Sequence, residues 1–302
     1  MMINISYVCF LNKTGYAQSA KDVILALYKS GKFNAKVESL TPSTDSSISN
    51  DCLILFKELS KKTLEKESIN IMNCIPPIQL RHKKATRNIG YGVFETICPP
   101  KNWIDILNGL DGIITPSRFN YEVFSHANIK VPIYYIPLCL DLDNFNRNVS
   151  PAFKYDKFTF LFFGTWKKRK GYEQLLEAWF SEFNSKDDVQ LIIKTDRIAT
   201  AKVQTELLRR KLGVLEKDSA PILFESTIFD EKSLPMFLKS CNCLISPTLG
   251  EGFGLPGLQC MALGVPVIIT DYSGCKDYAN ENTATLLKPE GFIHCPIMDN
   301  YP

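Results

Sequence analysis

The sequence predicts an α/β fold of two doubly wound, Rossmann-like domains, and three observations support this. The chain has 302 residues, whereas a single hydrophobic core rarely grows beyond about 250–300 residues. Short β-rich runs alternate with longer amphipathic segments along its whole length. Most of the β-rich runs are apolar throughout, which is typical of parallel strands covered by helices on both faces.

The first half of the chain is predicted to contain six strands and two helices. The predicted strands are residues 3–9, 35–40, 52–56, 89–93, 112–115 and 133–136. Apolar residues recur at helical spacing in the two predicted helices, residues 19–30 and 118–127. A polar stretch containing Ser150 and Pro151 follows the last of these strands, so residues 1–150 are predicted to form the first domain.

The second half repeats this alternation and predicts a second domain of residues 151–302. Its predicted strands are residues 158–163, 190–194, 222–224, 243–246, 265–270 and 285–287. Its predicted helices are residues 172–183, 201–212 and 232–239, with a further helix that begins near Pro256. In open α/β sheets, ligands bind beyond the carboxyl ends of the strands. The loops that follow the strands are therefore the places to look for a functional site.

Composition and charge exclude several classes of protein. The chain has 35 Lys and Arg residues against 32 Asp and Glu residues, a net charge of +3. This balance gives no broad basic surface, so nucleic acid is not expected as a partner. The N-terminus lacks a basic segment followed by an apolar one, and no apolar run reaches the roughly 18–20 residues that cross a bilayer. We therefore expect a cytoplasmic protein.

The ten cysteines predict reduced thiols, because disulfides are rare in the cytosol. Cys9, Cys139 and Cys260 lie in apolar runs, where a free cysteine packs as a small hydrophobic residue. Cys241 and Cys243 form a C-x-C, but no second pair at zinc-ligand spacing follows. No structural metal is therefore expected.

The most informative segment is residues 246–270, where a predicted strand ends in a glycine-rich turn before a helix. Phe253, Gly254 and Leu255 would present free N–H groups at the start of that helix, which is a ready anion site. Glu251 in the same turn suits a hydroxyl-rich ligand, since its carboxylate accepts hydrogen bonds. A tight turn with a solvated glutamate explains the same residues, and residue types alone do not decide between the two interpretations.

A dense basic loop joins a predicted strand to a predicted helix in residues 160–173. Lys167, Lys168, Arg169 and Lys170 follow the carboxyl end of the strand. Such a run is equally consistent with a solvated face and with a loop that binds a diphosphate. Lys194 ends the next strand of this half and is a weaker candidate for the same ligand, because a strand-terminal lysine is more often only solvated.

Together these segments resemble the donor site of family 4 (group 1) glycosyltransferases. The pattern is P-x-x-x-E-G-F-G-L-P at residues 247–256, followed by A-x-G-x-P-V-I at residues 262–268. The resemblance implies the GT-B fold, in which two Rossmann-like domains face each other across a cleft. It also implies that Glu251 lies near the donor sugar, that Lys170 binds the diphosphate, and that the second domain holds the donor.

Two positions depart from the family's pattern. The family's second glutamate, which commonly holds the ribose hydroxyls, is Gln259 here. The arginine that follows the strand's glycine is Thr165, and Arg169 is the residue that can offset this change. Because glutamine donates as well as accepts hydrogen bonds and carries no charge, these departures bear on nucleotide affinity and preference.

The resemblance is weaker in the first domain, where only short segments match. Gly15, in the loop after the first strand, is expected to let the backbone approach the donor from the other side of the cleft. Glu95 is expected to line the reaction centre, and the alternative is a loop carboxylate in a salt bridge. Asp141 and Asp143 spell D-x-D, but they fall in the family's interdomain segment, so no metal is expected there.

The resemblance implies a hexosyltransferase-type enzyme. It would move a sugar from a UDP-, GDP- or ADP-linked donor to a hydroxyl of a glycan or another acceptor, with retention of configuration and without a metal. The nucleotide sugar is then a co-substrate, and no further cofactor is expected. Peripheral membrane contact stays open, because many proteins of this family use lipid-linked acceptors. The sequence does not encode the oligomeric state.

Two other functions remain open at this point. One is a non-catalytic nucleotide-sugar or glycan-binding module with the same fold, favoured by Gln259, Thr165 and a chain that ends soon after Leu287, where the family usually continues through further helices. The other is a nicotinamide-dependent oxidoreductase. It is disfavoured because the loop after the first strand lacks G-x-G-x-x-G.

Overall fold

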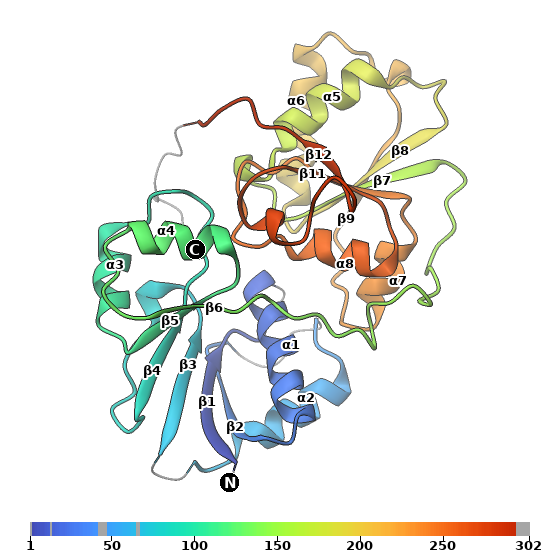
Figure 1. Cartoon of the computed structure of the whole chain (residues 1–302). Coiled ribbons are helices and arrows are strands. Elements are labelled where there is room, and N and C mark those ends of the chain that lie inside the picture. The colour runs from blue at the N-terminus through green and yellow to red at the C-terminus, as the bar shows by residue number, and fades with distance from the viewer. Residues whose placement is uncertain (1, 13, 42–46, 65–66, 294–302) are drawn as a thin grey trace.

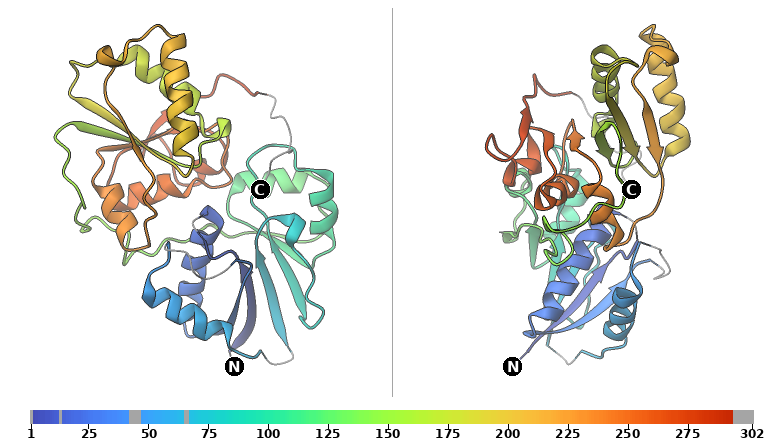
Figure 2. Two further views of the ribbon diagram at one scale, coloured as in Figure 1. Left: turned by 180° about the vertical axis from the view of Figure 1, so that it is seen from behind. Right: turned by 90° about the vertical axis from the view of Figure 1, so that its right-hand side faces the viewer.

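The computed structural model describes residues 2–12, 14–41, 47–64 and 67–293 of the chain. In these residues it forms two six-stranded parallel sheets, with the strand orders β2-β1-β3-β4-β5-β6 and β12-β11-β10-β7-β8-β9. Figure 1 shows the sheets in two lobes linked by the chain between β6 and β7, and the lobes stay distinct in both views of Figure 2. The predicted fold class, two doubly wound α/β domains, is confirmed.

The first sheet and its helices occupy the chain up to residue 135. The strands are β1 (Ile3–Cys9), β2 (Phe33–Ser39), β3 (Ser68–Asn73), β4 (Arg87–Tyr91), β5 (Gly112–Thr115) and β6 (Ile133–Tyr135). The helices are α1 (Gly15–Lys29), α2 (Asn50–Ser60), α3 (Lys101–Asn108) and α4 (Arg118–His126). Ile5, Tyr7 and Cys9 of β1 are buried against α1 and α2, whereas Met72 and Ile113 pack in a second cluster with α3 and α4.

The second sheet begins at residue 158. Its strands are β7 (Phe158–Phe163), β8 (Val189–Lys194), β9 (Ile222–Glu225), β10 (Cys243–Ser246), β11 (Val267–Thr270) and β12 (Thr285–Leu287). Its helices are α5 (Tyr172–Glu182), α6 (Ile198–Lys211), α7 (Ser233–Lys239) and α8 (Leu255–Leu263). Leu161 and Phe162 are neighbours in β7 but lie in different core clusters, since successive strand side chains point to opposite faces. The sheet is therefore buried on both faces, and the predicted boundary at residues 150 and 151 falls between the two sheets.

One predicted strand is wrong. Residues 52–56 were expected to be a buried strand but form the middle of α2, whose N-cap Ser49 accepts a hydrogen bond from the backbone N–H of Cys52. Cys52, Phe56 and Leu59 are buried, whereas Ile54 is exposed, so one stripe of the helix faces the core. A short apolar run has the same composition in a strand and in a buried helix, and here the capping serine marks the helix.

Two elements were not predicted. Strand β3 lies in the centre of the first sheet, between β1 and β4, although polar residues interrupt it. The side-chain amide nitrogens of these residues are bonded internally, since Asn70 Nδ2 donates to Asn88 Oδ1 at 3.1 Å and Asn73 Nδ2 donates to the Tyr7 hydroxyl at 3.0 Å. Their Oδ1 atoms are buried and have no hydrogen-bond partner among the described residues. The other element is α3, which is short and buries Trp103 and Leu107.

The nine cysteines that the structure describes are free thiols. Cys9 and Cys260 are buried as expected, but Cys139 is exposed, because the stretch between β6 and β7 runs along the surface. None of the helices in the described part of the chain is long and apolar enough to span a membrane.

Candidate active site

The candidate site lies where the order of the second sheet reverses. The chain runs outward from β7 through β8 to β9, then returns to the other side of β7 to form β10. The loops after β7 and β10 therefore lie side by side, and this is where doubly wound sheets bind ligands. The N–H of Leu249 and the hydroxyl of Thr248 both donate to the Arg169 carbonyl, at 2.7 Å and 3.1 Å, which ties the two loops together.

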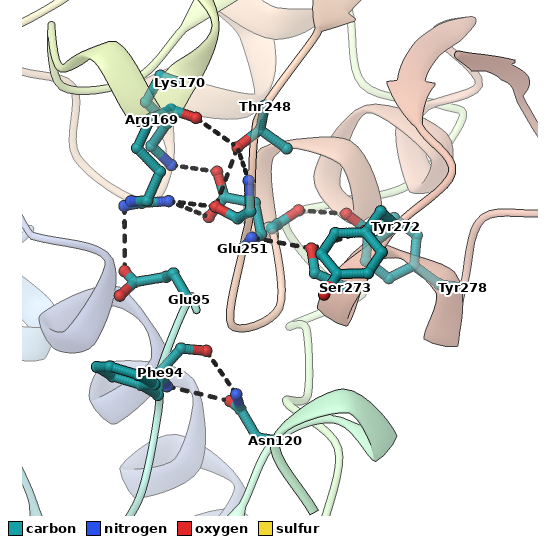
Figure 3. Close-up of polar contacts among 12 residues, drawn as sticks. Phe94, Glu95, Asn120, Arg169, Lys170, Thr248, Glu251, Tyr272, Ser273 and Tyr278 are labelled. Carbon is teal, nitrogen blue, oxygen red and sulfur yellow. Dashed lines mark hydrogen bonds and ion pairs between the residues drawn. The ribbon is translucent and has the colours of Figure 1, made fainter. Parts of the chain in front are cut away.

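The basic loop is shaped by a turn and a glycine. Lys168–Lys170 forms a single 3-10 turn that ends at Gly171, whose φ of +73° lies in the left-handed region. A β-carbon on Gly171 would come within 1.8 Å of the Pro247 carbonyl oxygen, so only glycine lets the two loops approach this closely. The turn directs the side chains of Arg169 and Lys170 toward the loop after β10, as Figure 3 shows.

Glu251 is the buried anion of the site, with 7% of its surface exposed. Its carboxylate accepts a hydrogen bond from Lys170 Nζ and lies 3.4 Å from Arg169 Nη1. Burial by itself raises the pKa of this carboxyl, but the positive charges of Lys170 and Arg169 outweigh burial and hold its pKa below the usual value. Ser273 Oγ accepts from the Glu251 backbone N–H at 2.9 Å and fixes the loop. Glu251 is therefore an ionised hydrogen-bond acceptor beside two cations.

Glu95 brings a second carboxylate into the cluster from the first domain. Its Oε1 lies 3.0 Å from Arg169 Nη2, so Arg169 bridges Glu95 and Glu251 (Figure 3). The other oxygen, Oε2, is buried and has no hydrogen-bond partner among the described residues. Burial raises the pKa of Glu95, Arg169 opposes this rise, and the nearby charge of Glu251 adds to it.

The backbone of Glu95 is held firmly beside the second domain. The side chain of Asn120, in α4, accepts from the Phe94 N–H at 3.3 Å and donates to the Phe94 carbonyl at 2.5 Å. A β-carbon on Gly250 would lie 2.3 Å from the Glu95 carbonyl oxygen, and one on Gly252 would lie 2.3 Å from Val93 Cγ1. These two glycines allow the loops of the two domains to touch.

Helix α8 supplies backbone donors next to Glu251. It begins at Leu255 after Gly254, whose φ of +87° turns the chain sharply into the helix. The backbone N–H groups of Phe253, Gly254 and Leu255 donate no hydrogen bond to the residues that the structure describes. The start of a helix carries partial positive charge, so this end of α8 suits a negatively charged group.

The remaining predicted residues lie in different surroundings. Gly15 is the first residue of α1, and an added β-carbon would meet no atom within 4 Å. Thr165 is half-buried in the loop after β7, and the guanidinium of the cluster comes from Arg169 instead. Gln259 lies one turn into α8, 2% exposed, and its Nε2 has no partner among the described residues.

Lys194 is not a solvated strand end, because only 8% of its surface is exposed. Its ammonium group lies over the rings of Phe163 and Phe229, at 5.8 Å and 5.6 Å from their centres. Asp141 and Asp143 both pair with Lys29, at the end of α1, at 3.4 Å and 2.7 Å.

Four residues of the site were not identified from the sequence. Asn120 fixes the backbone before Glu95, and Ser273 fixes that of Glu251. The hydroxyl of Tyr278 donates to the Gly254 carbonyl at 2.5 Å, and that of Tyr16 donates to the Val93 carbonyl at 3.3 Å. Each of these side chains acts on the backbone of another loop, so no local spacing pattern marks it.

Two hollows of about 420 Å³ and 790 Å³ lie at the opposite edge of the first domain. Arg87 and Tyr134 help to line the smaller one, whereas Lys36 and Ser68 help to line the larger one. Residues of the charged cluster line neither of them. The shared ion pairs between two domains, rather than the volume of a hollow, identify the candidate site.

Two doubly wound α/β domains with parallel sheets that face each other are the architecture of the GT-B fold. HepE of Anabaena in complex with UDP-glucose has this architecture, with a TM-score of 0.66 at 13% identity over 95% of this chain and 86% of HepE. A glycosyltransferase from Rickettsia africae gives a TM-score of 0.65 at 16% identity, over 96% of this chain and 85% of its own.

The second domain carries the match in sequence. Residues 157–294 match the family model described as glycosyl transferases group 1. An uncharacterized 41.2 kDa protein in the cps region of Klebsiella pneumoniae is 23% identical over 59% of this chain. The serotype-specific mannosyltransferase WbdA of Escherichia coli is 30% identical over 41% of this chain. The matched parts span 47% of the Klebsiella protein and 15% of WbdA.

Proposed function

We propose that this protein is a glycosyltransferase that moves a sugar from a nucleoside-diphosphate sugar to a hydroxyl of an acceptor. The observation that carries the proposal is the position of Glu251, a buried and ionised carboxylate in contact with both Arg169 and Lys170. A nucleotide sugar presents hydroxyl groups directly beside a diphosphate. A carboxylate that accepts hydrogen bonds and lies next to two cations is complementary to these hydroxyl groups and this diphosphate.

Each part of the donor has a partner in the proposed complex. Arg169, Lys170 and the free N–H groups at the start of α8 bind the diphosphate. Glu251 accepts hydrogen bonds from the sugar hydroxyls. Gln259, whose buried Nε2 lacks a partner among the described residues, hydrogen-bonds the ribose.

The proposed reaction exchanges one bond at the anomeric carbon for another. The bond from this carbon to the diphosphate oxygen breaks, and the acceptor oxygen bonds to the carbon on the same face of the sugar. The proton of the acceptor hydroxyl passes to the departing diphosphate, so a nucleoside diphosphate is released. Arg169 and Lys170 stabilise the negative charge that grows on the leaving group.

Retention of configuration and independence of a metal ion are part of the proposal. In place of a divalent cation, two side-chain cations and a helix N-terminus face the diphosphate. We expect transfer to continue in the presence of EDTA, and the product linkage, read by NMR, to have the anomeric configuration of the donor. Loss of transfer in EDTA that Mg²⁺ restores would refute metal independence.

The similar proteins indicate which donors to test first. HepE binds UDP-glucose and WbdA is a mannosyltransferase, so we propose a hexose donor and a glycan acceptor for this chain. The first experiment is a thermal-shift screen with UDP, GDP, ADP and their hexose derivatives. A ligand at about 100 times its dissociation constant stabilises the native state by about 2.7 kcal/mol. No shift with any of these nucleotides would contradict the proposal.

A second candidate, a nucleotide-sugar-binding module without activity, is favoured by the departures at Gln259 and Thr165. The two functions differ in turnover. When acceptor glycans are added, an enzyme releases nucleoside diphosphate from the donor that shifts the melting temperature of the protein. A binding module shows the same shift in melting temperature but releases no nucleoside diphosphate.

A further inference from the structure

Arg169 is shared between carboxylates of the two domains. One of its terminal nitrogens lies 3.4 Å from Glu251 of the second domain, and the other lies 3.0 Å from Glu95 of the first. Side-chain exposure is 23% for Arg169 and 16% for Glu95, so the bridge is largely shielded from water. The bridge holds together the two surfaces between which the donor and the acceptor would react.

This arrangement makes Glu95 a competitor of the donor. The proposed diphosphate needs Arg169, and its negative charge would lie close to two carboxylates that already share that cation. Lys170 continues to neutralise Glu251, but Glu95 has Arg169 as its only ion-pair partner among the described residues. A diphosphate that takes Arg169 therefore releases Glu95 rather than Glu251.

The released carboxylate is well placed to bind a second substrate. Its Oε2 is buried and already lacks a hydrogen-bond partner in the described residues. Asn120 holds the backbone of the preceding residue, Phe94, and the Glu95 carbonyl oxygen lies against Gly250, so only the side chain has to turn. A carboxyl oxygen can accept a hydrogen bond from a hydroxyl group.

We propose that Glu95 occupies Arg169 until the donor binds, and that the donor diphosphate then releases Glu95 to hold the hydroxyl of the acceptor. The enzyme consequently binds its substrates in order, with the donor first. This inference rests on the proposed glycosyltransferase function. It makes Glu95 a residue that positions the acceptor and lowers the affinity for the donor nucleotide.

The test is the affinity of the full chain for a nucleoside diphosphate, measured by titration calorimetry. The probe is whichever of UDP, GDP and ADP shifts the melting temperature of the wild type. Glu95→Gln keeps the shape of the side chain but removes its ion pair with Arg169. Nucleotide affinity is therefore expected to rise by about fivefold, which corresponds to the free energy of one shielded ion pair.

The matched control is Glu173→Gln. Glu173 pairs with Lys168 of the same basic loop at 3.2 Å, whereas Glu95 pairs with Arg169. This variant also removes one negative charge near the site, so its nucleotide affinity is expected to equal that of the wild type. An equal gain in both variants would show a general charge effect and would overturn the inference.

The second readout separates this role from a structural one. In transfer assays Glu95→Gln is expected to lower the KM for the donor while lowering kcat, because the acceptor hydroxyl loses its partner. A residue that only stabilised the fold would weaken nucleotide binding and lower the melting temperature together. If the wild type binds the nucleotide and Glu95→Gln binds it equally well or more weakly, the inference is refuted but the proposed function is not. A wild type that binds no nucleotide would refute both it and the proposed function.

Discussion

Lys170 and Arg169 are neighbours in the same turn but have different partners. Among the described residues, Lys170 pairs with the carboxylate of its own domain, whereas Arg169 pairs with carboxylates of both domains. Glu251 therefore stays neutralised by Lys170 when Arg169 changes partners. The shifts in the two carboxyl pKa values agree with this division, since that of Glu251 is held down by two cations and that of Glu95 is raised by burial.

The first prediction at this scale concerns Lys170. Lys170→Gln removes one of the cations proposed to face the leaving diphosphate and is expected to lower kcat by about 100-fold, as the loss of one transition-state contact does in other enzymes. Lys168→Gln is the control, because Lys168 lies in the same turn but is 65% exposed and pairs with Glu173. Equal rates for the two variants would contradict the role of Lys170.

Asp22, in α1, gives a prediction for the pH dependence of stability. Burial raises its pKa from 3.8 to about 7, with smaller contributions from the charges of Asp141 and Glu231. The native state thus binds this proton more tightly than the unfolded chain, and stability falls as the pH rises from 3.8 toward about 7. Asp22→Asn removes this pH-dependent loss of stability and keeps a hydrogen-bond acceptor for Gln18 Nε2.

We expect Asp22→Asn to melt at a higher temperature than the wild type near pH 8 and at the same temperature below about pH 4. Asp156→Asn, which changes an exposed carboxylate, is expected to have no effect at either pH. Thermal melts of the three proteins across this range test the prediction. A lower melting temperature of Asp22→Asn near pH 8 would show that the carboxylate is stabilising.

At the scale of elements, the site consists of loops that follow β4, β7 and β10. Parallel strands bring their carboxyl ends to one edge of each sheet, and the two edges face each other across the cleft. The glycines at 250 and 252 let the loop after β10 contact the loop after β4 without side chains between them. The glycine-rich turn thus serves contact between the domains as well as the approach of a ligand.

Gly250→Ala tests this contact. Its β-carbon would lie 2.3 Å from the Glu95 carbonyl oxygen, so the first domain must move away. We expect no loss of nucleotide affinity, because the proposed donor contacts lie in the second domain. Transfer is expected to fall by about 100-fold, because a displacement of about 1 Å has such an effect on aligned substrates. Gly291→Ala, at a glycine with open space around it, is the control. A wild-type transfer rate in Gly250→Ala would contradict the proposed role of this contact between the domains.

At the scale of the whole molecule, the second domain completes two helices of the first domain. Glu231 of the second domain accepts from the Ser49 N–H at the start of α2, at 3.1 Å. Asp277 accepts from the Arg118 N–H at the start of α4, at 3.0 Å. These hydrogen bonds are separate from the ion pairs of Arg169, so several contacts hold the two domains together.

Replacing both carboxylates with amides is expected to open the molecule. Glu231→Gln with Asp277→Asn removes two negative charges from helix N-termini, each worth about 0.3–1 kcal/mol. We expect the radius of gyration from solution X-ray scattering to rise without ligand and to return toward the wild-type value when nucleotide sugar binds. The exposed-site variant Glu281→Gln serves as the control. An unchanged radius would show that the remaining contacts suffice to hold the domains.

The sequence by itself determined the strand–helix alternation and the site segments of the second domain. Strands such as residues 158–163 and the turn around Glu251 are local patterns, because strand periodicity, proline and glycine act over a few residues. The same reasoning failed for residues 52–56, whose apolar run fits a strand or a helix, and for the polar central strand β3.

Only the tertiary structure decided which charges meet. Arg169 was one of four basic residues in a row, and Glu95 was a carboxylate in a weakly matching loop. The fold brings them within 3.0 Å, although 73 positions separate residues 95 and 169 along the chain. Contacts of this kind depend on how the two sheets face each other. Side chains from distant segments approach through the packing of whole domains, so no local spacing in the sequence records them.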